Sequence, residues 1–181
     1  MKKSFLTIAI PAVLLLSCSG NNSEPKKEEA ATTPTASAAD TKEAKEERNK
    51  QTALASVDAL IKGDVDGALK DAAPDVADYG SGEMKPLKGL DSVKSMLKSW
   101  RSVLEDYKGE NIVAMADGDR VAVFANWSGK FKDNFMGMKV KGKSFKTNDV
   151  DIFTFNSDGK VIEHRNVQSS AEMMHQLGVK Y

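Results

Sequence analysis

The sequence is poor in the residues that mark several common classes of protein. It has one cysteine, Cys18, so no disulfide can form within the chain. Lys and Arg together number 26, the same as Asp and Glu, and this balance argues against nucleic acid as the main partner, which would need a basic face. The two histidines, His164 and His175, have no clustered third ligand, so we expect no metal site and no cofactor.

Large apolar side chains are missing from residues 19–48, which contain no Leu, Ile, Val or aromatic residue. Such a segment cannot bury enough apolar surface to offset the entropy lost on ordering. We therefore expect residues 18–48 to be a disordered tether with an average span of roughly 30 Å. Residues 42–50 mix charges of both signs, which favours a solvated lead-in to a helix over a binding patch.

A long apolar run occurs at the N-terminus. Residues 1–17 combine two lysines with an apolar stretch too short for a membrane span, which is typical of a secretory signal peptide. Residues 15–18, Leu-Leu-Ser-Cys, resemble the lipobox of bacterial lipoproteins. The resemblance implies that Cys18 is lipidated and that acyl chains hold the exported protein on a membrane of the cell envelope. The alternative is an ordinary signal peptide with a chance cysteine.

Residues 49–181 have the length and patterning of one domain. Apolar spacing predicts helices over residues 54–61, 65–72 and 90–108. The period then changes to two, which predicts strands over 110–116, 120–131, 144–156 and 160–168, and a short helix follows from 169. This order indicates an α+β fold. We expect three helices on the concave side of a strongly curved antiparallel sheet, forming a cone with a pocket.

The hairpin of residues 151–166 raises a chemical question. Alternation places Asp151 on one face with phenylalanines, and His164 and Asn166 in line with Ile162. A turn centred on Ser157 and Asp158 would set Asp151 opposite His164, and Asp149 opposite Asn166. Polar groups inside an apolar cone are costly unless they are paired, and a ligand could complete their hydrogen bonds. A buried structural pair of Asp151 and His164 is the alternative.

Three stretches carry a resemblance to a known superfamily: ALIKGDVDGAL at 59–69, PDVADYGSG with the later KGLDSV, and VDIFTFNSDGKVIEHR at 150–165. They resemble the ketosteroid isomerase and SnoaL-like polyketide cyclase superfamily, whose cone-shaped fold is shared with nuclear transport factor proteins. The resemblance covers nearly all of residues 50–168. It implies the cone-shaped α+β fold and a pocket on the helix-covered face of the sheet.

The resemblance also implies roles for individual residues. The general base of ketosteroid isomerases matches Asp78, and the protonated aspartate that hydrogen-bonds the dienolate oxygen matches Asp151. The partner tyrosine falls on Ser56, whose hydroxyl is shorter, and this departure argues against steroid isomerisation itself. His164 would act with the two aspartates. We expect the pocket wall to include other matched or apolar residues: Tyr79, Trp100, Val123, Ala125, Trp127, Asp149, Asn166 and Gln168.

Three functions remain open on the sequence. The first is binding of a small apolar or amphipathic molecule in the pocket. The second is an isomerase or cyclase that removes a proton next to a carbonyl, with Asp78 as base. The third is an assembly module that forms homodimers through the sheet, with the pocket filled by its own side chains. The lysine-rich segment around residues 135–142 could be a solvated hairpin tip, a lid, a dimer contact, or a contact with anionic lipid or an acidic partner.

Overall fold

The computed structural model describes residues 41–82, 85–168 and 170–180. The signal peptide, Cys18 and most of the expected tether lie outside these residues, so lipidation and anchoring stay predictions. No helix within the described ranges is long and apolar enough to cross a membrane.

The first helix, α1 (Lys42–Lys62), starts seven residues before the expected domain boundary at Asn49. The Thr41 hydroxyl oxygen accepts the Ala44 N–H at 3.2 Å and caps the helix, and Gly63 ends it in the left-handed conformation at φ 84°. Residues 42–48 are therefore helical and not part of a disordered tether. Their charges stay in solvent, as expected for a lead-in, while Ala53 and Val57 are buried.

Two further helices precede the long strands. The second, α2 (Val65–Ala68), is a single turn, shorter than the expected 65–72. The third, α3 (Leu90–Ser102), begins after Gly89 as expected but ends six residues before 108. Leu104 follows the helical spacing, yet its backbone pairs with Phe131, and Lys132 donates its N–H to the Val103 carbonyl at 2.8 Å. Sheet pairing thus overrides the local helical pattern at the end of α3. Because α2 is a single turn, two helices are substantial where three were expected.

The strands form one mixed, six-stranded sheet in the order β2-β1-β6-β5-β4-β3. Their bounds are β1 (Ala72–Asp78), β2 (Leu87–Lys88), β3 (Leu104–Asp117), β4 (Arg120–Phe131), β5 (Ser144–Phe155) and β6 (Val161–Asn166). The expectation of a purely antiparallel sheet is wrong because β1 runs parallel to β6. The strands before α3 and at the end of the chain are far apart in sequence, and such a long connection permits a parallel pair.

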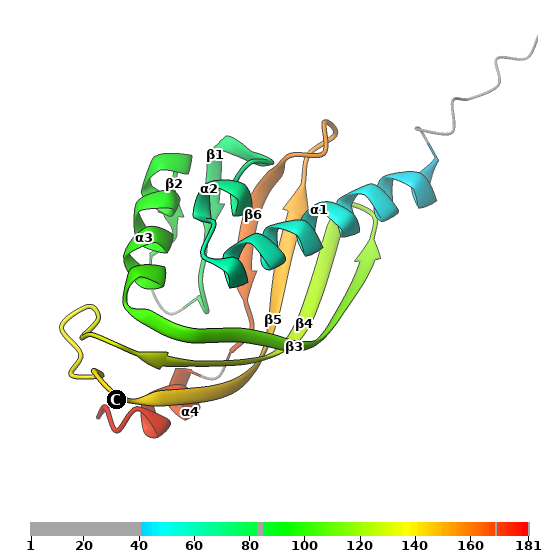
Figure 1. The fold of residues 1–181 in the computed structure, drawn as a ribbon. Coiled ribbons are helices and arrows are strands. Elements are labelled where there is room, and N and C mark those ends of the chain that lie inside the picture. Colours follow the sequence, from blue (N-terminus) through cyan, green and yellow to red (C-terminus); the bar gives the residue numbers. More distant parts are fainter. Residues whose placement is uncertain (1–40, 83–84, 169, 181) are drawn as a thin grey trace, which may run out of the picture. The chain divides into compact units, whose positions relative to one another are not determined.

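The sheet is also not curled into the strongly curved cone that was expected. Its edge strands, β2 and β3, do not pair with each other, and the sheet stays open. The helices α1, α2 and α3 lie on one side of it, and the short α4 (Ser170–Gln176) lies near one end of β5 (Figure 1). The expected short C-terminal helix is thus present, whereas its expected cap, Ser169, lies outside the described residues.

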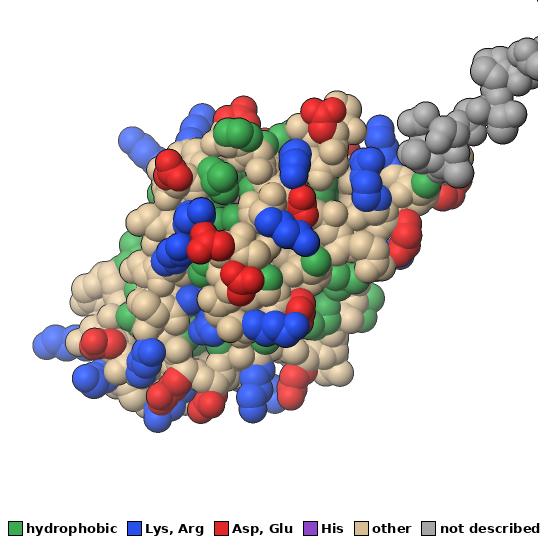
Figure 2. All heavy atoms as spheres, turned by 45° about the horizontal axis from the view of Figure 1, so that its top comes forward, with side chains coloured by type: hydrophobic (Ala, Val, Ile, Leu, Met, Phe, Trp, Pro, Cys, Tyr) green, Lys and Arg blue, Asp and Glu red, His purple; other side chains and the backbone are tan. Residues whose placement is uncertain are grey.

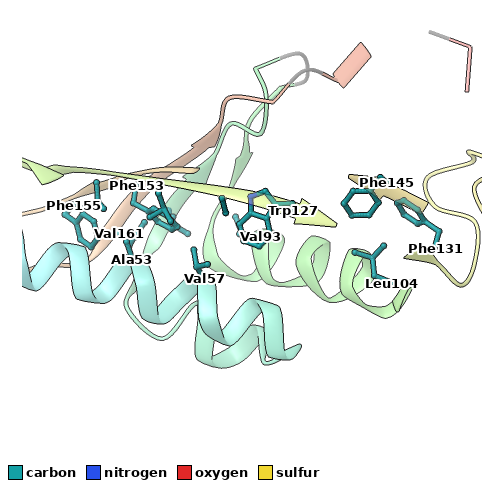
Figure 3. Close-up of a cluster of buried hydrophobic side chains, with 14 of the residues drawn as sticks. Ala53, Val57, Val93, Leu104, Trp127, Phe131, Phe145, Phe153, Phe155 and Val161 are labelled. Carbon is teal, nitrogen blue, oxygen red and sulfur yellow. The ribbon is translucent and has the colours of Figure 1, made fainter. Parts of the chain in front are cut away.

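The core lies between α1 and the sheet. Alternate residues of β4 face the helices, and Val121, Val123 and Ala125 are fully buried. Ala53 and Val57 point from α1 toward the sheet, close to Phe153, Phe155 and Val161, as Figure 3 shows. At the other end of the cluster lie Leu104, Phe131 and Phe145. The strand alternation expected for residues 120–131 is confirmed, and it decides which side chains face the helices.

Candidate functional site

Three ionisable side chains form a row across neighbouring strands: Asp78 of β1, His164 of β6 and Asp151 of β5. His164 Nδ1 lies 3.2 Å from Asp78 Oδ1, and His164 Nε2 lies 3.2 Å from Asp151 Oδ1. The parallel pairing of β1 with β6 sets Asp78 directly beside His164. The imidazole therefore bridges two carboxylates that the chain separates by more than seventy residues. All three residues predicted to act together are brought together.

The expected cross-strand partners are nevertheless wrong. Asp151 pairs with Asn166, and Phe153 pairs with His164. One residue of the shift comes from the turn, which has three residues and is closed by the Asn156 N–H bonded to the Lys160 carbonyl at 2.9 Å. The second comes from a bulge that leaves Ile162 unpaired between Thr154 and Phe155.

Two one-residue shifts restore the same face because side chains alternate with a period of two. His164 therefore still faces Asp151, across a diagonal instead of directly. Before the bulge the phase differs, and Val161, not Ile162, faces inward with the histidine. The sequence thus predicted the correct face by way of the wrong register.

Histidine 164 carries the strongest perturbation in the row. Burial acts to lower its pKa, but the hydrogen bonds and negative charges of Asp151 and Asp78 outweigh burial and raise the pKa to about 10. The side chain keeps 26% of its surface exposed, and it lines the cavity described below. At neutral pH the imidazole is therefore protonated, with each nitrogen donating to one carboxylate.

Asp78 is held in its charged form. Burial acts to raise its pKa, but the hydrogen bond and charge of His164, together with the Gly80 N–H at 2.8 Å, lower it overall. A carboxylate with a lowered pKa is a weak base. The geometry therefore gives Asp78 the task of fixing the imidazolium more readily than the task of removing a proton.

Two further polar pairs continue the row along β5 and the end of β6. Asn166 Nδ2 donates to Asp149 Oδ2 at 3.0 Å, and Gln168 Nε2 donates to Thr147 Oγ1 at 3.0 Å. Asp149 is 7% exposed, and burial together with the charge of Asp151 raises its pKa, although the Asn166 amide opposes the shift. Burial thus favours the protonated form of the Asp149 carboxyl group.

These polar side chains form one wall of a cavity of about 570 Å³. Most of the other lining is apolar, and it comes from α1, α3, β4, the β4–β5 loop and α4. The predicted pocket residues that line it are Ser56, Asp78, Trp100, Trp127, Asp149, Asp151, His164, Asn166 and Gln168. A volume of this size fits a small organic molecule.

Three predicted lining residues lie elsewhere. Val123 and Ala125 face inward but pack in the core under α1, so they are buried without bordering the cavity. Tyr79 follows Asp78 on the opposite face, where its hydroxyl donates to Glu163 at 3.5 Å and the Arg165 guanidinium lies 4.6 Å from its ring centre. Alternation along the strand explains why Asp78 reaches the cavity and Tyr79 does not.

The hydroxyl of Ser56 is committed to structure. It donates to the Ala68 carbonyl at 2.8 Å and so ties α1 to the end of α2. This residue occupies the position that the resemblance gives to a tyrosine. The bond leaves Ser56 as a lining group whose proton is already used, consistent with the expected loss of a strong donor at this position.

A tyrosine elsewhere was missed. Tyr107 lines the cavity from β3, stacked on Trp127 with ring centres 5.3 Å apart and edge-on to Trp100 at 4.9 Å. Burial first, and then the charge of Asp151, raises its pKa well above the usual value. Its hydroxyl forms no hydrogen bond within the described residues. The sequence predicts a helix over residues 90–108, and Tyr107 continues its apolar spacing, so the pattern concealed its place in a strand.

Among the residues that the structure describes, no group of three His, Cys, Asp or Glu side chains is arranged to hold a metal ion. The carboxylates on either side of His164 contact its two different nitrogens, so they do not converge on a common point. The polar wall is therefore a hydrogen-bonding surface built from side-chain donors and acceptors.

Solved structures with the same fold were found in several bacteria. AclR from Streptomyces galilaeus, described as "a putative hydroxylase", is 26% identical with a TM-score of 0.63, over 74% of this chain and 97% of that one. A "putative polyketide cyclase" from Xanthomonas campestris pv. campestris is 21% identical, with a TM-score of 0.67 over 74% and 98%. An NTF2-like protein from Burkholderia xenovorans LB400 is 20% identical, with a TM-score of 0.60 over 72% and 96%.

These similarities show that the chain shares its α+β fold with SnoaL-like and NTF2-like proteins. No curated protein matches the chain. The family model for SnoaL-like polyketide cyclases matches residues 50–177, which include α3, every strand and nearly all of the cavity lining. The chain belongs to the SnoaL-like polyketide cyclase family.

Proposed function

We propose that this domain binds a small amphipathic molecule in the cavity, with the apolar part against the aromatic and methionine side chains and a carbonyl or hydroxyl group at the polar wall. The observation that carries the proposal is the cavity itself, with about 570 Å³ of space, a mostly apolar lining and a group of polar side chains along β5 and β6. A ligand with separate apolar and polar ends matches this division. A pocket filled by its own side chains would have supported the assembly module instead.

The polar wall offers both kinds of hydrogen-bonding group. The protonated His164 is already shared between two carboxylates, whereas the hydroxyl of Tyr107 is a donor with no hydrogen bond among the described residues. The available acceptors are carboxylate oxygens of Asp149 and Asp151. A ligand oxygen that accepts from Tyr107 would give that hydroxyl the partner it lacks, which is a favourable exchange inside an apolar site.

The test uses prodan, a neutral, flat fluorophore with one ketone, as a probe for the full chain. Leu97→Trp adds bulk to the cavity wall from α3, and Met115→Trp adds the same bulk at a side chain that is 63% exposed on β3. We expect the Leu97 variant to bind prodan at least about tenfold more weakly than wild type, equivalent to about 1.4 kcal/mol. The Met115 variant should bind normally. Equal binding by a folded Leu97 variant would rule out the cavity as the site.

A second candidate function is proton transfer next to a carbonyl, and the raised pKa of Asp149 favours it. In this scheme the Asp149 carboxylate takes a proton from the carbon beside the ligand carbonyl, and the Tyr107 hydroxyl donates a hydrogen bond to the enolate oxygen that forms. This assigns the base to Asp149, since Asp78, the base that the resemblance implies, is tied to His164.

The test is deuterium exchange into 2-tetralone, followed by NMR. We expect wild type to accelerate exchange at the carbon next to the carbonyl, and Asp149→Asn to remove the acceleration by a factor of about 100 or more. Asp78→Asn should keep part of it. Loss of exchange in the Asp78 variant alone would return the base to Asp78. No acceleration by wild type would leave binding as the function that this cavity supports.

A further inference from the structure

The hairpin that joins β4 to β5 concentrates positive charge. Residues 130–146 contain six lysines and one acidic residue, Asp133. The lysines are Lys130, Lys132, Lys139, Lys141, Lys143 and Lys146. In Figure 1 this hairpin projects beyond the end of the sheet, beside the C-terminal helix. The chain as a whole carries no net charge, so this local excess is set apart from the rest of the molecule.

Most of this charge is not neutralised by neighbouring carboxylates. Lys130 pairs with Glu105 at 2.7 Å, and the Lys143 ammonium donates to the Leu177 carbonyl. The other four lysines are exposed, and their ammonium groups form no ion pair within the described part of the chain.

The helix-covered face differs. There Lys94 and Lys98 share Asp66 at 2.9 Å, and Figure 2 shows charges of both signs side by side. Lys94 and Lys98 therefore have a local partner, whereas the four exposed hairpin lysines face solvent without one among the described residues.

The tip of the hairpin is apolar. Phe135 and Met138 exchange backbone hydrogen bonds, and between them Met136 and Gly137 form a tight turn with positive φ angles of 47° and 78°. A positive φ is unfavourable for a residue with a side chain, and here it holds Met136 outward with 59% of its surface exposed. Phe135, Met136 and Met138 also line the cavity, so the tip lies at the cavity mouth.

We propose that this hairpin docks on an anionic lipid bilayer, with Met136 in the headgroup region and Lys132, Lys139, Lys141 and Lys146 against lipid phosphates. Exposed lysines next to an apolar side chain are what such a surface attracts. A nucleic acid or an acidic protein would use the charge and leave the apolar tip in water. The bilayer is the partner that accommodates both features.

Docking would place the mouth of the cavity against the lipid. An amphipathic ligand could then pass between bilayer and cavity without crossing water. This consequence depends on the ligand-binding function proposed above, whereas the docking itself does not. The experiment therefore measures docking with empty vesicles, so that its failure is distinct from a failure of the ligand proposal.

The test uses the full chain with Cys18→Ser, so that an introduced cysteine is the single thiol. An NBD fluorophore is attached at Met136→Cys, or at Ser157→Cys in the exposed β5–β6 turn as a matched control. Vesicles contain phosphatidylcholine alone or with 30% phosphatidylglycerol. A triple variant, K132Q, K139Q and K141Q, removes the charge, and K45Q, K70Q and K88Q removes as much from exposed lysines elsewhere.

We expect the label at position 136 to brighten and shift to the blue with anionic vesicles, and the label at 157 to stay unchanged. The hairpin triple variant should need about 100-fold more lipid for the same response, while the control triple variant should match the parent chain. Equal responses at 136 and 157, or equal responses to neutral and anionic vesicles, would overturn the proposal. So would a label that responds to an acidic peptide or an oligonucleotide but not to vesicles.

Discussion

Two halves of one sheet face have the same strand alternation, but one half is packed core and the other lines a cavity. Under α1, the inward side chains Val121, Val123 and Ala125 meet the helix and are fully buried. Elsewhere on the same face, the inward side chains Trp127, Asp149 and His164 line the cavity. The difference shows that alternation assigns a residue to a face, while the covering helix decides whether that face becomes core or cavity.

The largest contrast should appear on removing an aromatic side chain from each half. Phe155 is 2% exposed in the packed half, so Phe155→Ala should destabilise the domain by about 3–5 kcal/mol. Trp100 borders the cavity, so part of its surface already faces open space, and Trp100→Ala should cost about half as much. Urea unfolding measures both. Equal losses would mean that the region around Trp100 is packed like the core.

A smaller effect concerns the charged row of Asp78, His164 and Asp151 in the cavity lining. The folded pKa of His164 lies at about 10, above its ordinary value of 6.5. Its stabilisation is therefore complete below pH 6.5 and is lost as the pH rises through 10. We expect the free energy of unfolding to fall by a few kcal/mol across this window, at about 1.4 kcal/mol for each pKa unit. Urea unfolding at pH 6.5, 8 and 10 measures the loss.

The His164→Gln variant is the control for this pH dependence. It should be less stable at pH 6.5 and should lose less stability on going to pH 10, because its side chain has no proton to release. An NMR titration of the imidazole should also show a lower pKa in Asp151→Asn, where one of the two carboxylates is gone. If the free energies of unfolding of wild type and His164→Gln fell equally with rising pH, the row of Asp78, His164 and Asp151 would not be the source of this pH dependence.

The smallest contrast compares two hydroxyl groups in the cavity lining. Ser56 donates to the Ala68 carbonyl, so Ser56→Ala should cost about 1 kcal/mol of stability and leave prodan binding unchanged. Tyr107 has no internal partner among the described residues, so Tyr107→Phe should change stability by less than about 0.5 kcal/mol. Its effect should appear in prodan affinity. If Tyr107→Phe lost more stability than Ser56→Ala, the tyrosine hydroxyl would form a hydrogen bond that stabilises the fold, contrary to this prediction.

Much of the site was predictable from local patterns. The period of two in residues 120–131 and 144–156 identified the strands and their inward faces, and the family resemblance placed Asp78 near the pocket. Those two facts together place Asp78, His164 and Asp151 on the pocket face, but the contacts among them depend on the parallel β1–β6 pair, which the sequence did not predict. The register was not predictable, because a bulge at Ile162 and a three-residue turn leave no distinct mark in the sequence.

The third helix shows the limit of periodicity most clearly. Apolar residues at 93, 97, 100, 104 and 107 satisfy helical spacing, but the last two, Leu104 and Tyr107, make their core contacts from β3. The choice depends on pairing with β4, a partner whose position no local pattern contains. The sequence prediction placed Leu104 and Tyr107 in the helix, and for this reason it did not identify Tyr107 as a cavity-lining hydroxyl without a hydrogen-bond partner among the described residues.

The sequence by itself determined the family, the order of the helices and of the strands that follow α3, the inward faces of β4 and β5 and the lysine-rich hairpin, because these depend on residue type and on neighbours a few positions away. Tertiary structure alone decided the parallel β1–β6 pair, the bridge of His164 between two carboxylates, the protonation that follows from it and the open cavity. Those features depend on distances between residues far apart in the chain. Such distances are set by how helices cover the sheet and by where bulges shift its register.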